Sequence, residues 1–190
     1  MESNNELLNE IDNIRSNYFS NVNTIFNLNK SKHKLQCARQ ISEKIDLEKL
    51  LQNTVFRLPN TKKVYFDYPM FKTFANPSTY DDIIEYILKL SIDCINDFGT
   101  FEMHINLKSF SVSAAERYKV CIENFIKKCI SKSTPFVKTT ERVYIYNTPS
   151  VIDSISRLVS PFIEPEVKSR MIFFDKNESQ HLLKELLHNN

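Results

Sequence analysis

The residues of this 190-residue chain that could transfer a proton lie together on one predicted strand. Glu102, His104 and Asn106 alternate with apolar residues over 101–107, and side chains two apart on a strand share a face. A general base also needs a nucleophile or a reactive group within reach, and the sequence identifies none. The row is equally typical of the solvated or ligand-facing side of a strand. An enzyme using Glu102 and His104 is therefore the least favoured of three hypotheses about function, and the other two depend on the patterns described below.

The chain lacks the residues that usually build nucleotide-binding loops, metal sites and catalytic nucleophile motifs. The chain has a single glycine, Gly99, whereas phosphate-binding loops and nucleophile elbows need several. Its four cysteines, Cys37, Cys94, Cys121 and Cys129, form no Cys-x-x-Cys pair and lie within predicted helices. Buried free thiols in a reducing compartment are the simplest interpretation. We expect no enzyme activity, no cofactor and no metal ion.

The net charge and the hydropathy of the chain limit the kinds of partner that it is expected to bind. Lys and Arg number 25 against 23 Asp and Glu, a net charge of +2, and a nucleic-acid-binding domain usually concentrates more positive charge. The first ten residues are polar, and no apolar run approaches the roughly 20 residues of a membrane span. We expect a cytoplasmic protein that binds no nucleic acid and contacts membranes only transiently and peripherally.

The apolar pattern predicts an α/β fold. Helical spacing is found over 4–28, 34–52, 78–97, 113–130 and 178–187, with a further helix after residue 150, and strand patterns are found over 55–58, 64–66, 101–107, 143–146 and 171–174. Strands separated by helices favour a mostly parallel or mixed sheet flanked by helices. We expect an N-terminal helical extension over 1–53 and one α/β domain over 54–190. The apolar stripe of 4–28 would pack on this domain or on a second copy, as a homodimer.

Residues 143–174 carry the most informative pattern. A strand ends at Asn147-Thr148-Pro149 and turns into an amphipathic helix that Pro161 interrupts, because proline lacks a backbone donor. The apolar side of this helix consists of Ile152, Ile155, Leu158, Val159 and Phe162. A charged turn then leads into the last strand. An amphipathic helix of this kind, held between two strands, can lift as a lid.

This arrangement resembles the lid region of the Sec14-like, or CRAL-TRIO, lipid-binding domains. In that family the strand ends in Asn-Ala-Pro or similar and the lid helix ends in Lys-Pro-Phe-Leu; here these positions read Asn147-Thr148-Pro149 and Ser160-Pro161-Phe162-Ile163. The turn Asn106-Leu107-Lys108-Ser109 takes the place of the family's Asp-Leu-Lys-Gly-like turn. The resemblance spans about residues 54–188, and its specific part is 147–170.

The resemblance implies a pocket for a lipid or another small lipophile, closed by a lid helix at about 150–163, and transfer of that lipid between membranes. The implied pocket and lid residues are Ile152, Ile155, Leu158, Val159, Phe162, Ile163, Tyr144 and Tyr146. The implied headgroup residues are Arg170, Lys138 and Glu141. For Arg170 the alternative is an ion pair with Glu166 or Glu164. For the whole domain the alternative is a filled pocket and a protein partner, such as a small GTPase or a second copy.

Overall fold

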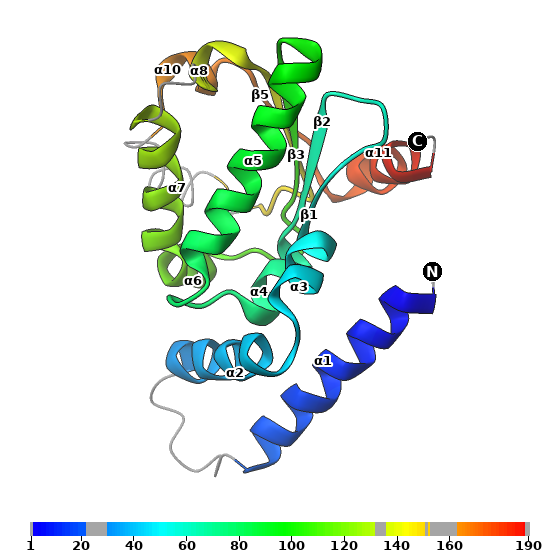
Figure 1. Cartoon of the computed structure of the whole chain (residues 1–190), viewed down its shortest axis with the longest axis vertical. Helices are drawn as coiled ribbons and strands as arrows, with labels where there is room; N and C mark the ends of the chain where they lie inside the picture. Colours follow the sequence, from blue (N-terminus) through cyan, green and yellow to red (C-terminus); the bar gives the residue numbers. More distant parts are fainter. Residues whose placement is uncertain (1, 22–29, 132–135, 151, 153–162, 189–190) are drawn as a thin grey trace.

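The computed structural model describes residues 2–21, 30–131, 136–150, 152 and 163–188 (Figure 1). Its centre is one five-stranded sheet with the strands in the order β1-β2-β3-β4-β5. Only β1 runs antiparallel to its neighbour, so the expected mostly parallel, mixed sheet is confirmed. The strands are β1 (Val55–Arg57), β2 (Lys63–Asp67), β3 (Phe101–Asn106), β4 (Thr140–Tyr146) and β5 (Met171–Phe173).

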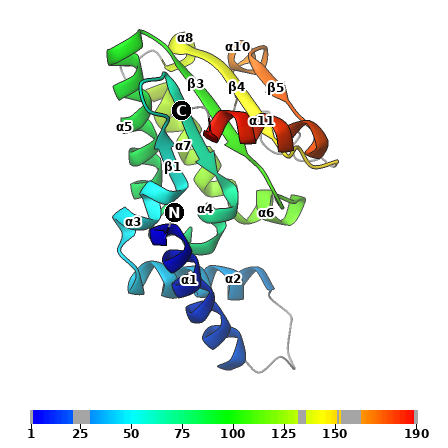
Figure 2. The same cartoon turned by 90° about the vertical axis from the view of Figure 1, so that its right-hand side faces the viewer.

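Helices cover both faces and one end of this sheet. Their bounds are α1 (Glu2–Asn21), α2 (Lys30–Lys44), α3 (Leu47–Thr54), α4 (Tyr68–Phe74), α5 (Tyr80–Phe98), α6 (Val112–Arg117), α7 (Lys119–Ser131), α8 (Phe136–Thr139), α10 (Pro165–Lys168) and α11 (Lys176–His188). Figures 1 and 2 show α5 and α7 on one face, which we call the first face, and α11 on the other, the second face. No described helix is both long enough and apolar enough to cross a membrane.

The alternation of β3 decides which residues reach each face. Phe101, Met103 and Ile105 belong to the larger core, on the first face, with the apolar stripe of α5. His104 points to the second face, where α11 packs through Leu186. Because the core on the first face is larger and apolar, that face is where an apolar ligand could be enclosed.

The first helix packs on its own chain. Leu7 and Ile11 are 0% and 2% exposed, and they share a core with Cys37 and Ile41 of α2. On the same helix Phe19 stays exposed. The rest of the predicted stripe, at residues 22–28, lies outside the described residues. The part of the stripe around Leu7 and Ile11 therefore packs within the chain, and a homodimer through 4–28 stays a prediction.

Two local predictions are corrected. The single helix expected over 34–52 is divided between α2 and α3, because Asp46 caps α3 by accepting a hydrogen bond from the backbone N–H of Glu48 at 3.0 Å. The region of Pro69, which lies outside the helices and strands predicted from the sequence, forms α4. There the proline occupies the first turn, where its missing donor does no harm, and Asp67 caps the helix.

Candidate functional site

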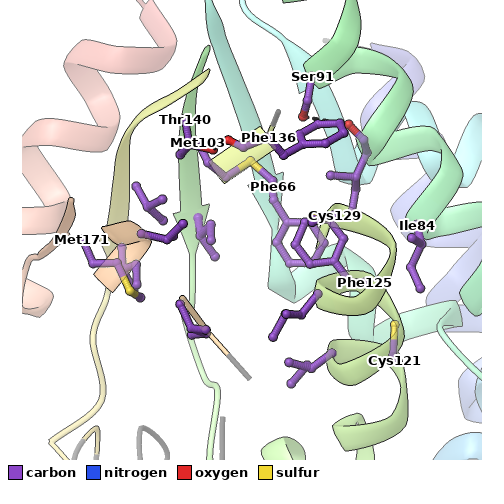
Figure 3. Close-up of a pocket in the computed structure, with 18 of the residues that line it drawn as sticks. Phe66, Ile84, Ser91, Met103, Cys121, Phe125, Cys129, Phe136, Thr140 and Met171 are labelled. Carbon is purple, nitrogen blue, oxygen red and sulfur yellow. Dashed lines mark hydrogen bonds between the residues drawn. The ribbon is translucent and has the colours of Figure 1, made fainter. Parts of the chain in front are cut away.

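An apolar cavity of about 350 Å³ lies between the first face of the sheet and the helices α5 and α7. Its size falls within the ~300–1,000 Å³ range of small-molecule pockets. Figure 3 shows side chains of the sheet, among them Met103 and Met171, across the space from side chains of α7, among them Phe125. Hydrocarbon, aromatic rings and sulfur make up almost the whole wall.

The parallel register builds the floor of the cavity. Met103, Val143 and Met171 lie side by side across β3, β4 and β5, and Ile105 and Ile145 form the next row on the same face. Residues paired in a parallel ladder point to the same side of the sheet, so each row presents a continuous apolar surface. The sequence thus places large apolar side chains at every floor position of these strands.

Two hydroxyl groups of the wall, those of Ser91 and Thr140, already form hydrogen bonds to main-chain carbonyls. Ser91 donates to the carbonyl of Ile87 at 2.9 Å, and Thr140 donates to the carbonyl of Phe136 at 2.6 Å. Burial raises the pKa of the Cys121 thiol to about 12, so this thiol stays protonated at neutral pH and is a poor nucleophile. The described wall therefore offers a guest mainly apolar contact.

Arg170 follows α10, which is a neighbour of α8 (Figures 1 and 2). Its guanidinium donates to the carbonyls of Val137 and Thr140, each at 2.6 Å, and pairs with the carboxylate of Glu166. Val137 and Thr140 both line the cavity. The ion pair that the sequence offered as the alternative is formed, and Arg170 holds this part of the cavity wall together.

The two other headgroup candidates do not line the cavity. Lys138 is exposed on α8. Glu141 is exposed, pairs with Lys62 and accepts a hydrogen bond from the hydroxyl of Thr100 at 3.1 Å. The bond to Lys62 holds the pKa of the Glu141 carboxyl below its usual range. The structure therefore does not bring Glu141 and Arg170 together around one ligand.

Two of the named lid candidates are described, and both line the cavity: Ile152 near the beginning of the predicted lid and Ile163 at its end. The other lid candidates, Ile155, Leu158, Val159 and Phe162, lie outside the described residues.

The expectation that Tyr144 and Tyr146 line the pocket is wrong. In β4 it is Val143 and Ile145 that face the cavity, and side chains alternate along a strand. Both tyrosines lie on the second face, where they stack on Phe174 with ring centroids 6.3 Å and 5.3 Å away.

The predicted proton-transfer row is also on the second face, enclosed by these tyrosines. His104 is 3% exposed, its ring stacks on Tyr144 at 4.7 Å, and its Nδ1 lies 2.9 Å from the hydroxyl of Tyr146. Its Nε2 lies 3.4 Å from a carboxylate oxygen of Glu102. Burial, with a smaller contribution from Lys63, lowers the pKa of His104 to about 4. The histidine is therefore neutral at neutral pH and engaged in internal contacts.

Sequence reasoning missed the wall that α5 and α7 contribute. Ile84, Ile87, Phe125 and Ile126 all line the cavity, yet their helical spacing is also that of an ordinary packed core. Within the described part of the chain, no group of three or more His, Cys, Asp or Glu side chains could hold a metal ion.

Comparison with known proteins gives a family and a fold. The profile of the CRAL/TRIO domain matches residues 64–190. Among solved structures, the crystal structure of Sfh5 is similar, with a TM-score of 0.51 and 16% sequence identity, over 77% of this chain and 56% of that chain. This chain thus spans little more than half the length of that neighbour, and at this identity the likeness concerns the fold alone. No curated protein matches the chain.

Proposed function

The chain belongs to the CRAL/TRIO family of lipophile-binding domains, and we propose that it binds a lipid or another small lipophile in the cavity between the sheet and α5 and α7. The observation that carries the proposal is the almost wholly apolar wall, whose hydroxyls of Ser91 and Thr140 already donate to main-chain carbonyls. Each methylene that a guest buries there gains about 0.8 kcal/mol. The side chains around the space also gain the dispersion contacts that an empty cavity lacks.

The proposed lid is the segment 150–163. Its support is that Ile152 and Ile163, near its two ends, both line the cavity. A carrier of an apolar guest must close over it in water and open at a membrane, so we propose transient docking to a membrane surface and transfer of the guest there. On this proposal the protein works in the cytoplasm.

Arg170 stays the first choice for a headgroup contact, with Lys138 beside it on α8. Arg170 adjoins the cavity end through its bonds to Val137 and Thr140. A guanidinium can bind a phosphate with two parallel hydrogen bonds. On this proposal a phosphate would share the guanidinium with Glu166, its present ion-pair partner.

The alternative functions have less support. A protein-interaction module with a filled pocket would leave no volume between the sheet and α5 and α7, whereas about 350 Å³ is open there. An enzyme using Glu102 and His104 would need a substrate to reach His104, which is buried against Tyr144 and Tyr146. Both observations favour ligand binding.

A fluorescent fatty-acid analogue tests the proposal. Val143→Phe adds bulk on the floor of the cavity, and its matched control is Ile172→Phe, on the second face at the adjoining strand. We expect saturable binding by the wild-type chain and the Ile172→Phe variant, and at least a tenfold weaker affinity for Val143→Phe. Equal affinities for the two variants would place the guest elsewhere.

A further inference from the structure

Six basic residues lie on α1, α2, α4, α6 and the turn after β3, and these elements are at the end of the molecule opposite α8 and α10 (Figures 1 and 2). We call them the basic cluster: Arg15, Lys30, Lys34, Lys72, Lys108 and Arg117. They come from four helices and from the turn after β3, so only the fold brings them together. Burial lowers the pKa of Lys34 and of Lys72, and the charges of the other cluster members lower both values further.

Lys72 has a fixed position within this cluster. Its Nζ donates to the hydroxyl of Ser109 at 2.6 Å and lies 5.8 Å from the ring centroid of Tyr68. Ser109 adopts a positive φ of 67°, in the turn that directly follows β3. A hydroxyl partner and an aromatic ring orient an ammonium group without neutralising its charge.

Arg117 is fixed in the same manner on the neighbouring ring. Its Nε donates to the hydroxyl of Ser31 at 3.0 Å, and its Cζ lies 5.6 Å from the ring centroid of Tyr118. The rings of Tyr118 and Tyr68 are themselves 6.3 Å apart. The two central cations are therefore held over two adjoining rings by neutral groups.

No member of the basic cluster forms an ion pair with a carboxylate within the described residues. Among the described residues, the carboxylate of Asp67 acts on Lys72 and raises its pKa, against the effects of burial and of the other cations. The carboxylate of Asp67 already accepts hydrogen bonds from Asn106, Tyr65 and the backbone of Met70. The charge of Asp67 therefore offsets the mutual repulsion of the cluster only in part, and a bound anion would relieve the rest.

We propose that the basic cluster is a binding site for a phosphate monoester group, with Lys72 and Arg117 as its central ligands. A phosphate dianion offers three strong acceptor oxygens, and it therefore matches a group of cations of different shape in which Lys72 and Arg117 have fixed positions. Tyr68 and Tyr118 also line the cavity, so this site lies directly behind the cavity wall, at the end away from Arg170. The phosphate would belong either to the headgroup of an anionic lipid or to a free ion.

Vesicle flotation tests whether the bound phosphate belongs to the headgroup of a lipid. The probes are phosphatidylcholine vesicles with and without phosphatidic acid, and the variants are Lys72→Ala/Arg117→Ala and the control Lys89→Ala/Lys184→Ala. The control removes the same charge from exposed sites on α5 and α11. We expect affinity for the phosphatidic acid vesicles to fall about fivefold for each cluster cation removed, and less than twofold in the control. Lys34→Ala/Lys108→Ala, at two exposed positions, should show the same loss without any risk to folding.

A titration with inorganic phosphate alone tests whether the site binds a free phosphate ion. Binding to the wild-type chain and to the control, but to neither cluster variant, supports the site. If phosphate binds in solution while phosphatidic acid vesicles are not retained, the natural ligand is a free phosphate. Equal behaviour of cluster variants and control in both assays overturns the proposal. Loading of the fluorescent fatty-acid analogue should be unchanged in all variants, so failure of the site is distinguishable from failure of the cavity.

Discussion

Arg170 and Glu166 form an ion pair across the end of α10, and the same guanidinium donates to the carbonyls of Val137 and Thr140. The half-buried side chain thus joins α10 to α8 and to the beginning of β4. This relationship makes Arg170 a structural residue of the cavity end, whatever it binds in addition.

Replacing Arg170 with alanine should therefore destabilise the fold. Hydrogen bonds to charged groups contribute ~1.5–3 kcal/mol each, and we expect a loss of about 2 kcal/mol in the free energy of unfolding. Urea denaturation measures it. Lys168→Ala, at the exposed last position of α10, is the control and should change little. If Arg170→Ala were as stable as this control, the bonds to Val137 and Thr140 would not contribute in solution.

The stability of the protein should fall as the pH drops from about 6.5 toward 4. His104 has its pKa lowered from 6.5 to about 4 in the folded chain, so below pH 6.5 the unfolded chain binds the proton more readily. A shift of this size corresponds to roughly 3 kcal/mol, lost progressively over that interval. Urea denaturation of the wild-type chain and of His104→Gln across this range checks it. A variant with the same acid sensitivity as the wild-type chain would assign the effect to other groups.

Tyr146→Phe should weaken the fold and leave ligand binding intact. The substitution removes the hydroxyl that lies 2.9 Å from Nδ1 of His104, and a buried polar group without its partner costs about 1–3 kcal/mol. Because Tyr146 lies on the second face, the affinity for the fatty-acid analogue should not change. A large loss of affinity would indicate that Tyr146 contacts the ligand, and would contradict its position on the second face.

The behaviour of β4 shows what the sequence could and could not predict. Its strand character was evident, but Val143, Tyr144, Ile145 and Tyr146 are all apolar or aromatic, so alternation alone did not reveal which pair faces the cavity. The answer lies in the register with β3, where Val143 pairs with Met103 and Tyr144 pairs with His104. Parallel pairing is a property of the fold, and no local pattern encodes it.

The end of α5, the division between α2 and α3, and the cavity differ in how far the nearby sequence determines them. Gly99 ends α5 with a φ of 76°, a conformation that suits glycine, and the sequence pattern already ended a helix there. The division at Asp46 was missed because Ile45 continues the apolar spacing across it. A cavity remains where side chains do not fill the space that the surrounding helices and strands enclose. Apolar spacing could therefore predict which residues form the wall, but not that a space remains between them.

The buried part of α1 should be important for stability and its exposed part should not. Leu7→Ala removes a side chain that is 0% exposed, and such substitutions cost ~2–5 kcal/mol. Leu8→Ala, on the exposed side of the helix, is the matched control. Urea denaturation compares the two, and light scattering measures the mass of the control. A lower mass for Leu8→Ala than for the wild-type chain would indicate that the stripe joins two copies.

Native mass spectrometry of the gently purified protein tests the central claim most directly. The account predicts a species heavier than the chain alone, from which organic extraction releases a lipophile, and it predicts that Ile172→Phe retains this species while Val143→Phe loses it. Detection of only the bare chain, for the wild-type protein and both variants and even after incubation with lipid vesicles, would contradict the proposal that the cavity binds a lipid.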